Sequence, residues 1–320
     1  MLSVNRAACK LVEKLCDNAD KHKITVTKQK TGATIIDAGI KAEGSFSAGR
    51  AITEICMGGL ATAQILPKQY GDFELPSIFV QTNHPAIATL GSQFAGWHLR
   101  KPPFSAIVSG PGRALALKPK EIYDKIGYKD KADSAVVVLE TNKNPPEPLL
   151  SELASECGIK QNKLYVILTP TTSITGSVQI SGRVTETAIH KLTKLGLDPK
   201  TIDYICGYAP VAPVHPEFAE AMERTNDAIL YGGIVYCTLH HKNDKHLKSI
   251  VDKAPSKASK QYGKPFKQIL KQANNDIFKM DPLLFAPAML IVNNLKTGTT
   301  YSAGEINVSM LKRTLGLAQQ

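Results

Sequence analysis

"KLYVILTPTTSITGSVQISGRVTETAIHKL" (residues 163–192) joins an uninterrupted apolar run to a segment with helical spacing. Residues 163–171 predict a strand buried on both faces, because their apolar side chains do not alternate with polar ones. Residues 178–192 predict a helix. Apart from the lysines near its two ends, only Arg183 and Glu186 carry a formal charge in this stretch. The sequence therefore predicts a buried strand followed by a buried helix that holds one cation and one anion.

The charged pair in this predicted helix has two possible explanations. Arg183, Glu186 and His190 are three and seven residues apart, so they share one face of a continuous helix. One explanation is a structural salt bridge. A buried ion pair costs desolvation free energy, however, and a carboxylate that an arginine keeps ionised can take a proton from water. The second explanation is therefore a catalytic base with a cationic partner, and spacing alone does not decide between the two.

The rest of the chain predicts a mixed α/β protein. Strand patterns alternate with helix patterns, and hairpins are expected near both ends, at residues 24–39 and 283–306. A chain of 320 residues is longer than one core usually spans. We expect an α+β (mixed α/β) fold with mixed or antiparallel sheets. Domain A would comprise roughly residues 1–120 with 275–320, and domain B roughly residues 121–274.

Composition narrows the class of protein. The net charge is +11, which favours anionic partners such as nucleic acid, acidic membranes or a small substrate with phosphates or carboxylates. Many of the lysines lie in residues 240–272, where few aromatic side chains accompany them, so we expect no nucleic-acid binding. We find no signal peptide and no apolar run of membrane-spanning length, and the cysteines form no C-x-x-C motif. A cytoplasmic protein with free thiols is expected.

Most motifs of catalysis and cofactor binding are absent from the sequence. It has no G-x-G-x-x-G after a strand, no Walker loop, no H-E-x-x-H and no G-x-S-x-G. Cys237, His240, His241 and His246 are close in sequence, but they lie in the lysine-rich tract without a second pair of metal ligands. We therefore expect no metal.

Seven blocks of the sequence carry a resemblance to a known family. They are "VNRAACKLVEKL" (4–15), "GATIIDAGIKAEGSFSAGR" (32–50), "ICMGGLA" (55–61), "FVQTNHPAIATLGSQFAGW" (79–97), "SGPGRAL" (109–115), "LTPTTSITGSVQISGRVTETAIHKL" (168–192) and "RTNDAILYGG" (224–233). In these blocks the chain resembles the methenyltetrahydromethanopterin cyclohydrolases, essentially from end to end.

The resemblance implies an activity and an assembly. Family members hydrolyse the 5,10-methenyl cation of tetrahydromethanopterin reversibly to the 5-formyl derivative, in one-carbon metabolism, and release a proton. The resemblance also implies a homotrimer of two-domain subunits, with the pterin in an interdomain cleft. It implies no metal and no prosthetic group, because tetrahydromethanopterin is the substrate carrier. The positive net charge would then attract the phosphate and carboxylates of the pterin tail.

The resemblance also assigns site residues. The family's catalytic arginine and glutamate correspond to Arg183 and Glu186, which composition had already singled out. Glu186 would take a proton from water, and Arg183 would orient both the carboxylate and the water. His190 shares their predicted face and is a candidate for substrate binding.

Five further residues are weaker candidates for substrate binding. Glu140 and Asp227 could accept hydrogen bonds from the amino-pyrimidinone edge, although Asp227 could instead cap a helix or pair with Arg224. Phe94 and Trp97 could flank the flat ring, or they could pack in a core. The backbone amides of residues 109–113, with Arg113, could hold an anion, or they could form a structural turn.

An alternative function belongs to another class. The chain could be a non-catalytic pterin-binding or carrier protein on the same fold, and a nucleic-acid-binding module ranks third. The intact pair of Arg183 and Glu186 argues against a carrier. The sequence does not indicate the direction of one-carbon flux in the cell.

Overall fold

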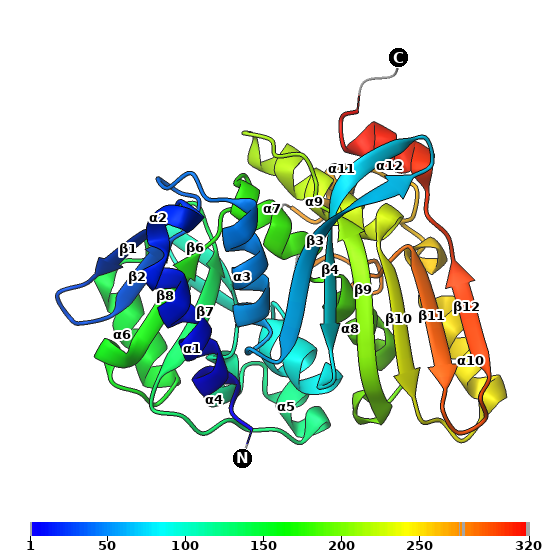
Figure 1. Cartoon of the computed structure of the whole chain (residues 1–320), viewed down its shortest axis with the longest axis horizontal. Coiled ribbons are helices and arrows are strands. Elements are labelled where there is room, and N and C mark those ends of the chain that lie inside the picture. The colour runs from blue at the N-terminus through cyan, green and yellow to red at the C-terminus, as the bar shows by residue number, and fades with distance from the viewer. Residues whose placement is uncertain (1, 275, 277–278, 318–320) are drawn as a thin grey trace. The chain divides into compact units, whose positions relative to one another are not determined.

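Helices and two six-stranded sheets make up the chain (Figure 1), which confirms the expected α+β class. The computed structural model describes residues 2–274, 276 and 279–317. The chain divides into two compact units: unit 1 comprises Met1–Thr62 and Ala86–Gln179, and unit 2 comprises Ala63–Pro85 and Ile180–Gln320. None of the helices that the structure describes is long and apolar enough to span a membrane.

These units group the chain differently from the two predicted domains. The prediction separated residues 121–274 from the C-terminal segment. In the structure, β10 (Ile234–Leu239) pairs in parallel with β11 (Met289–Asn294), so both belong to one sheet. The same sheet takes in β4 (Phe73–Thr82), which pairs with β9 (Ile202–Pro210). Pairing between strands that are distant in sequence sets the division, and local sequence patterns do not reveal that pairing.

The sheet of unit 1 has the strand order β1-β2-β8-β7-β6-β5. Its strands are β1 (Thr25–Lys28), β2 (Thr34–Asp37), β5 (Trp97–Lys101), β6 (Phe104–Ser109), β7 (Ala135–Glu140) and β8 (Leu164–Leu168). The central strands β7 and β8 are parallel and almost completely buried, as their apolar runs predicted. The predicted N-terminal hairpin is the antiparallel pair of β1 and β2.

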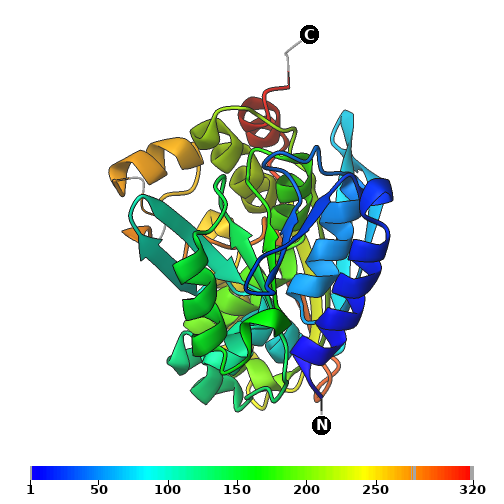
Figure 2. The same cartoon turned by 90° about the vertical axis from the view of Figure 1, so that its left-hand side faces the viewer.

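Helices and short helical turns surround this sheet. They are α1 (Val4–Asp17), α2 (Ala19–His22), α3 (Phe46–Cys56), the π-helix η1 (Ile87–Gln93), α4 (Arg113–Ala116), α5 (Lys120–Ile126), α6 (Glu147–Glu156), η2 (Gln161–Lys163) and α7 (Ile174–Ser181). Alternate residues of β7 point into two separate cores. Val136 and Val138 pack with residues of α1 and α3, whereas Val137 and Leu139 pack with residues of α6. Figure 2 shows α1 and α3 side by side on one face.

The sheet of unit 2 has the order β12-β11-β10-β9-β4-β3, with β3 (Ala61–Tyr70) and β12 (Thr300–Gly304) at its edges. The predicted C-terminal hairpin is the antiparallel pair of β11 and β12. The helical elements of this unit are α8 (Val184–Lys194), η3 (Pro199–Thr201), α9 (Phe218–Gly232), α10 (Asp244–Lys253), η4 (Ser256–Ala258), α11 (Phe266–Gln272) and α12 (Val308–Thr314).

The predicted helix over residues 178–192 is interrupted, and in this respect the prediction was wrong. Helix α7 ends at Ser181 and α8 begins at Val184. The backbone of Arg183 has φ −87° and ψ 2°, and its amide donates to the carbonyl of Ile180 at 2.9 Å, one residue closer than in an α-helix. The Ser-Gly pair before Arg183 is a common helix breaker, which is the physical reason for the break.

Candidate active site

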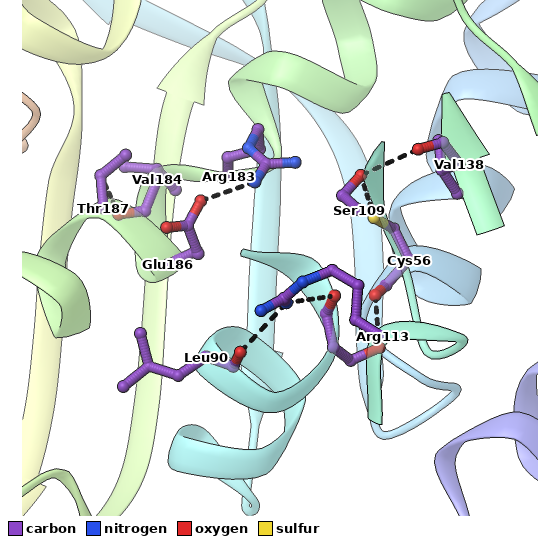
Figure 3. A network of polar contacts seen from close by, with 10 residues as sticks. Cys56, Leu90, Ser109, Arg113, Val138, Arg183, Val184, Glu186 and Thr187 are labelled. Atoms are coloured by element: carbon purple, nitrogen blue, oxygen red, sulfur yellow. Dashed lines mark hydrogen bonds and ion pairs between the residues drawn. The ribbon is translucent and has the colours of Figure 1, made fainter. Parts of the chain in front are cut away.

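Arg183 and Glu186 form a buried ion pair at the start of α8. Arg183 Nη2 donates to Glu186 Oε2 at 2.9 Å (Figure 3), and the two side chains are only 11% and 6% exposed. Arg183 is the N-cap residue of α8, and Glu186 is the third residue of its first turn. The two charges therefore meet because the helix begins at Val184, and not because they share a face of a longer helix.

The start of α8 is a favourable place for a carboxylate. The first backbone N–H groups of a helix have no intrahelical acceptors, and together they carry a partial positive charge. The helix around the pair is buried on every side, from Val184 to Thr193. The Thr187 hydroxyl donates to the Val184 carbonyl at 2.8 Å, and the Thr187 amide donates to the Arg183 carbonyl at 2.9 Å. These bonds hold the first turn, and with it the carboxylate, in one orientation.

His190 lies one helical turn beyond Glu186 and is only 8% exposed. Burial lowers the pKa of the imidazole below its usual value, and the Lys194 and Lys191 ammonium groups lower it further, while the Glu186 carboxylate opposes them. A lowered pKa favours the neutral imidazole, a form in which one ring nitrogen donates a hydrogen bond and the other accepts one. His190 thus extends the polar row that begins with the ion pair.

Lys191 is a buried residue of this helix that the sequence did not single out. Its side chain is almost fully buried, and its Nζ donates to the carbonyl of Leu283. Burial lowers the pKa of this ammonium, and the Asp281 carboxylate opposes the shift. The available signal was spacing, because Lys191 follows Thr187 by four residues and Arg183 by eight. Lysines are usually exposed, so this spacing alone did not predict burial.

Arg113, a candidate for holding an anion, lies far from solvent. Its side chain is fully buried, and its Nε donates to the Lys118 carbonyl at 2.8 Å. Its Nη1 donates to the carbonyls of Leu90 and Ser92 at 3.1 and 3.2 Å, and Figure 3 shows the bond to Leu90. These bonds tie the start of α4 to the π-helix η1. The geometry favours a structural role.

The turn that precedes Arg113 also uses its backbone amides within the fold. The Gly110 amide donates to the Ser92 carbonyl at 2.9 Å, and the Gly112 amide donates to the Val136 carbonyl at 2.8 Å. Gly110 has φ +96°, a conformation that favours glycine. Residues 109–113 therefore form a structural turn, which was the alternative explanation for this motif.

The two predicted ring-stacking residues have structural contacts. Trp97 on β5 is buried in the apolar core of unit 1, and Lys118 Nζ lies 5.1 Å from its ring centroid. Phe94, which directly follows η1, is half-buried, and the Arg113 guanidinium lies 5.3 Å from its ring centroid. Core packing accounts for Trp97, whereas the half-exposed Phe94 retains surface that a ligand can contact.

The two predicted pterin-binding carboxylates differ in exposure. Glu140 ends β7, is half-buried, and accepts a hydrogen bond of 2.5 Å from the Thr171 hydroxyl. Asp227 on α9 is fully buried, so its carboxyl does not reach a ligand in this conformation. The acceptors of Arg224 include the carbonyls of Pro213 and Val214, and no ion pair of Arg224 with Asp227 is seen in the part of the chain that the structure describes.

Asp227 is nevertheless an unusual group. Burial raises the pKa of its carboxyl well above the usual value, and the Glu223 carboxylate raises it further. The Phe266 amide, the Arg313 guanidinium and the Thr314 hydroxyl lower it only in part. Asp227 therefore lies where α9 packs against α11 and α12. Because its pKa is raised in the folded state, the free energy of unfolding should depend on its protonation.

The cysteine and histidines considered as metal ligands are not gathered into one cluster. His246 Nδ1 lies 3.5 Å from His241 Nε2, while His240 Nε2 lies 3.1 Å from Asp203 Oδ2. Across residues 2–274, 276 and 279–317, no group of three or more His, Cys, Asp or Glu side chains is placed to hold a metal ion.

Comparison with known proteins identifies the family. The profile of the family described as "Cyclohydrolase (MCH)" matches residues 3–315. The chain is 44% identical over 320 residues to the methenyltetrahydromethanopterin cyclohydrolase of Methanothermobacter marburgensis, which covers 99% of this chain and 100% of the relative. It is 43% identical over 319 residues to the protein of that name from Methanocaldococcus jannaschii, with 99% of each chain covered. The chain therefore belongs to the methenyltetrahydromethanopterin cyclohydrolase family.

Proposed function

We propose that this chain catalyses the reversible hydrolysis of the 5,10-methenyltetrahydromethanopterin cation to 5-formyltetrahydromethanopterin. Its relatives carry the name of this activity and match over the whole chain. The observation that carries the proposal is the ion pair of Arg183 and Glu186, whose side chains are 11% and 6% exposed at the start of a buried helix. A pair that served only to stabilise the fold would be costly to bury.

Glu186 acts as the general base in this proposal. The methenyl carbon is electrophilic because two nitrogens share its positive charge. As the oxygen of a water attacks this carbon, the C–O bond forms and the carboxylate of Glu186 takes one proton from the water. The amidinium becomes a neutral carbinolamine, and Glu186 becomes a carboxylic acid.

The ring opens in the second step. The C–N bond breaks, the departing nitrogen receives a proton from Glu186, and the carbinolamine hydroxyl loses its proton as the formyl C=O forms. The balance is one water consumed and one proton released for each cation hydrolysed. Glu186 returns to its carboxylate form and is ready for the next turnover.

Arg183 is the partner that makes Glu186 an effective base. Its guanidinium is always charged, and its hydrogen bond to Oε2 fixes the orientation of the Glu186 carboxylate. Because the carboxylate also attracts the bound cation in the ground state, attraction alone would not raise the turnover number. The catalytic gain comes from holding base and water in place before the reaction begins.

Other features of the family are proposed on the resemblance. We propose that Glu140, Phe94 and His190 contact the pterin, that the lysine-rich tract 240–272 helps to attract its anionic tail, and that the assembly is a homotrimer without metal or prosthetic group. Several lysines of this tract form surface ion pairs, among them Lys257 with Glu305 and Lys248 with Asp252.

The purified chain should be mixed with the methenyl cation, which absorbs in the near ultraviolet while the formyl product does not. We expect many equivalents of cation to be consumed per chain, with one formyl product for each. The alternative function, a pterin carrier, predicts that at most one equivalent is bound and that no formyl product appears. That result would overturn the proposal.

A further inference from the structure

The sheet of unit 2 has two unlike faces. Side chains of its strands alternate between the faces, and those on the inner face, such as Val235 and Leu290, are fully buried. This inner face packs on α8, since a Cβ atom added to Gly207 of β9 would lie 3.4 Å from Thr185 Cγ2. The residues that alternate with them are only half-buried.

Register places the half-buried residues in rows that cross the strands. One row runs through Tyr208, Ile234 and Met289, and the next through Cys206, Tyr236 and Ile291. We call these six residues the open face. In Figure 1 the strands of this sheet lie in front, and the described helices α8 and α10 of the same unit lie behind them.

The rows continue beyond these six residues onto the neighbouring strands, where Lys68 is the charged residue found beside them. On β4, Phe79 lies beside Tyr208, and Gln81 lies beside Cys206 and accepts a 2.9 Å hydrogen bond from the Tyr204 hydroxyl. On β12, Ser302 lies beside Ile291. At the β3 edge, Lys68 Nζ lies 4.6 Å from the centroid of the Tyr208 ring, where it forms part of a polar rim.

The low charge of the face selects the partner. Two copies of a chain with net charge +11 repel each other, so copies associate best through a face that carries few cations, and here Lys68 lies at its β3 edge. Acidic partners, by contrast, would be drawn to the lysines of residues 240–272 rather than to this face. Aromatic residues and methionine are typical of the centres of protein interfaces, and a second copy supplies the same uncharged surface.

The size of the face is also suitable. A third row runs through Tyr204, Thr238 and Asn293 but does not reach β4, which ends at Thr82. Four or five strands about 4.8 Å apart, crossed by three rows about 6.7 Å apart, present roughly 450 Å² in projection. Side-chain relief and strand β3 add to this area. A standard interface buries about 800 Å² per partner, and large apolar patches are uncommon on monomers.

We propose that the open face is buried between copies of this chain. This proposal rests on the proposed homotrimer, and it adds the surface through which the copies make contact. It does not depend on the roles of Arg183 and Glu186.

The test measures molar mass by light scattering after gel filtration. Ile291→Glu places a charge at the centre of the open face, and Val26→Glu, on the exposed strand β1 of unit 1, is the matched control. We expect the wild-type chain and Val26→Glu to have the same mass, a multiple of 34.6 kDa. Ile291→Glu should fall to a single copy of 34.6 kDa.

If Ile291→Glu does not fold, a second pair of variants that changes polar residues tests the same proposal. Thr238→Lys adds a cation to the next row of the same face, and Thr27→Lys makes the same change on β1. Circular dichroism checks that each variant is folded. A wild-type mass of 34.6 kDa, a folded face variant that keeps the wild-type mass, or dissociation by the β1 controls as well would each overturn the proposal.

Turnover of the methenyl cation is measured on the same samples. An active wild-type chain with the mass of one copy would reject the open face as an interface and leave the proposed function intact. A chain that assembles through the open face but shows no turnover would reject the proposed function and leave the interface intact.

Discussion

Arg183 and Arg113 are both buried arginines, but their surroundings differ. Arg113 donates to the backbone carbonyls of Leu90, Ser92 and Lys118, which are neutral and fixed in place by the fold. Arg183 faces the carboxylate of Glu186, which can gain or lose a proton. A cation held by carbonyls stabilises a fold, whereas a cation paired with a titratable group can take part in proton transfer. The comparison predicts that replacing Arg183 lowers turnover, whereas replacing Arg113 lowers the free energy of unfolding.

Replacing Arg183 should lower turnover far more than replacing Arg113. Arg183→Ala leaves the carboxylate of Glu186 without its partner, and removal of one such positioning donor typically costs on the order of a hundred- to a thousandfold in turnover. Arg183→Lys, which keeps the charge but not the fork of donors, should lie between the wild type and the alanine variant. The double variant with Glu186→Gln should lose less than the product of the two single losses, because the residues act as a unit. Losses that multiply would argue against this coupling.

Replacing Arg113 should lower stability instead. Arg113→Met keeps the length of the side chain but removes three hydrogen bonds to backbone carbonyls, at a cost on the order of 3 kcal/mol in the free energy of unfolding. Turnover per folded molecule should stay near that of the wild type. Denaturant unfolding and turnover on one preparation measure both quantities.

Arg50→Met is the control for this variant. Arg50 forms a partly exposed ion pair with Glu54 on α3, and such pairs are worth less than about 1 kcal/mol. If Arg113→Met kept its stability and raised the Michaelis constant, Arg113 would be a substrate-binding residue and the comparison of the two arginines would fail.

Asp227 predicts a smaller effect that depends on pH. Unfolded aspartate ionises near pH 4, and burial raises the pKa of Asp227 in the folded state. Between these two values folding takes up a proton, so the free energy of unfolding falls as pH rises through this window. Asp227→Asn does not titrate. It should be more stable than the wild type at pH 7 by on the order of 1 kcal/mol, since each unit of pKa elevation costs about 1.4 kcal/mol, and this difference should vanish toward pH 4.

Unfolding at several pH values tests this prediction against Asp252→Asn. Asp252 lies on the exposed side of α10, where it pairs with Lys248, so its replacement makes the same chemical change at the surface. An Asp227→Asn chain with the pH dependence of the wild type would show that Asp227 is ionised within the fold.

Removal of metal should have no effect. The proposed mechanism needs only a positioned water and a base, so dialysis against a strong chelator should leave the turnover number unchanged. Loss of turnover that added zinc restores would contradict the proposed metal-independent reaction.

The sequence predicted the local elements well. The apolar runs at residues 134–140 and 163–171 became β7 and β8, because a strand buried on both faces needs apolar side chains at every position. Both hairpins were also predicted, since β-rich arms around Thr-Gly turns leave few other conformations. Charge composition alone drew attention to Arg183 and Glu186.

The sequence did not predict features that depend on tertiary contacts. Spacing suggested one continuous helix, whereas the chain breaks at Gly182. Glu186 therefore meets Arg183 in the first turn of α8, and not along the face of a longer helix. Arg113 was a candidate for holding an anion, with a structural turn as the alternative, and the sequence did not decide between the two. The acceptors of Arg113 are backbone carbonyls, and every sequence provides these, so no residue type marks their position. Lys191 was overlooked for the same reason.

The turnover number of folded Glu186→Gln is the most direct test of the central claim that Glu186 is the base. Glutamine keeps the shape of the side chain and can hold a water, but it cannot accept the proton. The account predicts a melting temperature near that of the wild type and a loss of turnover on the order of a hundred- to ten-thousandfold. A folded variant with near-normal turnover would contradict the account, as would a variant that melts several degrees lower while activity per folded molecule persists, because Arg183 and Glu186 would then form a structural ion pair only.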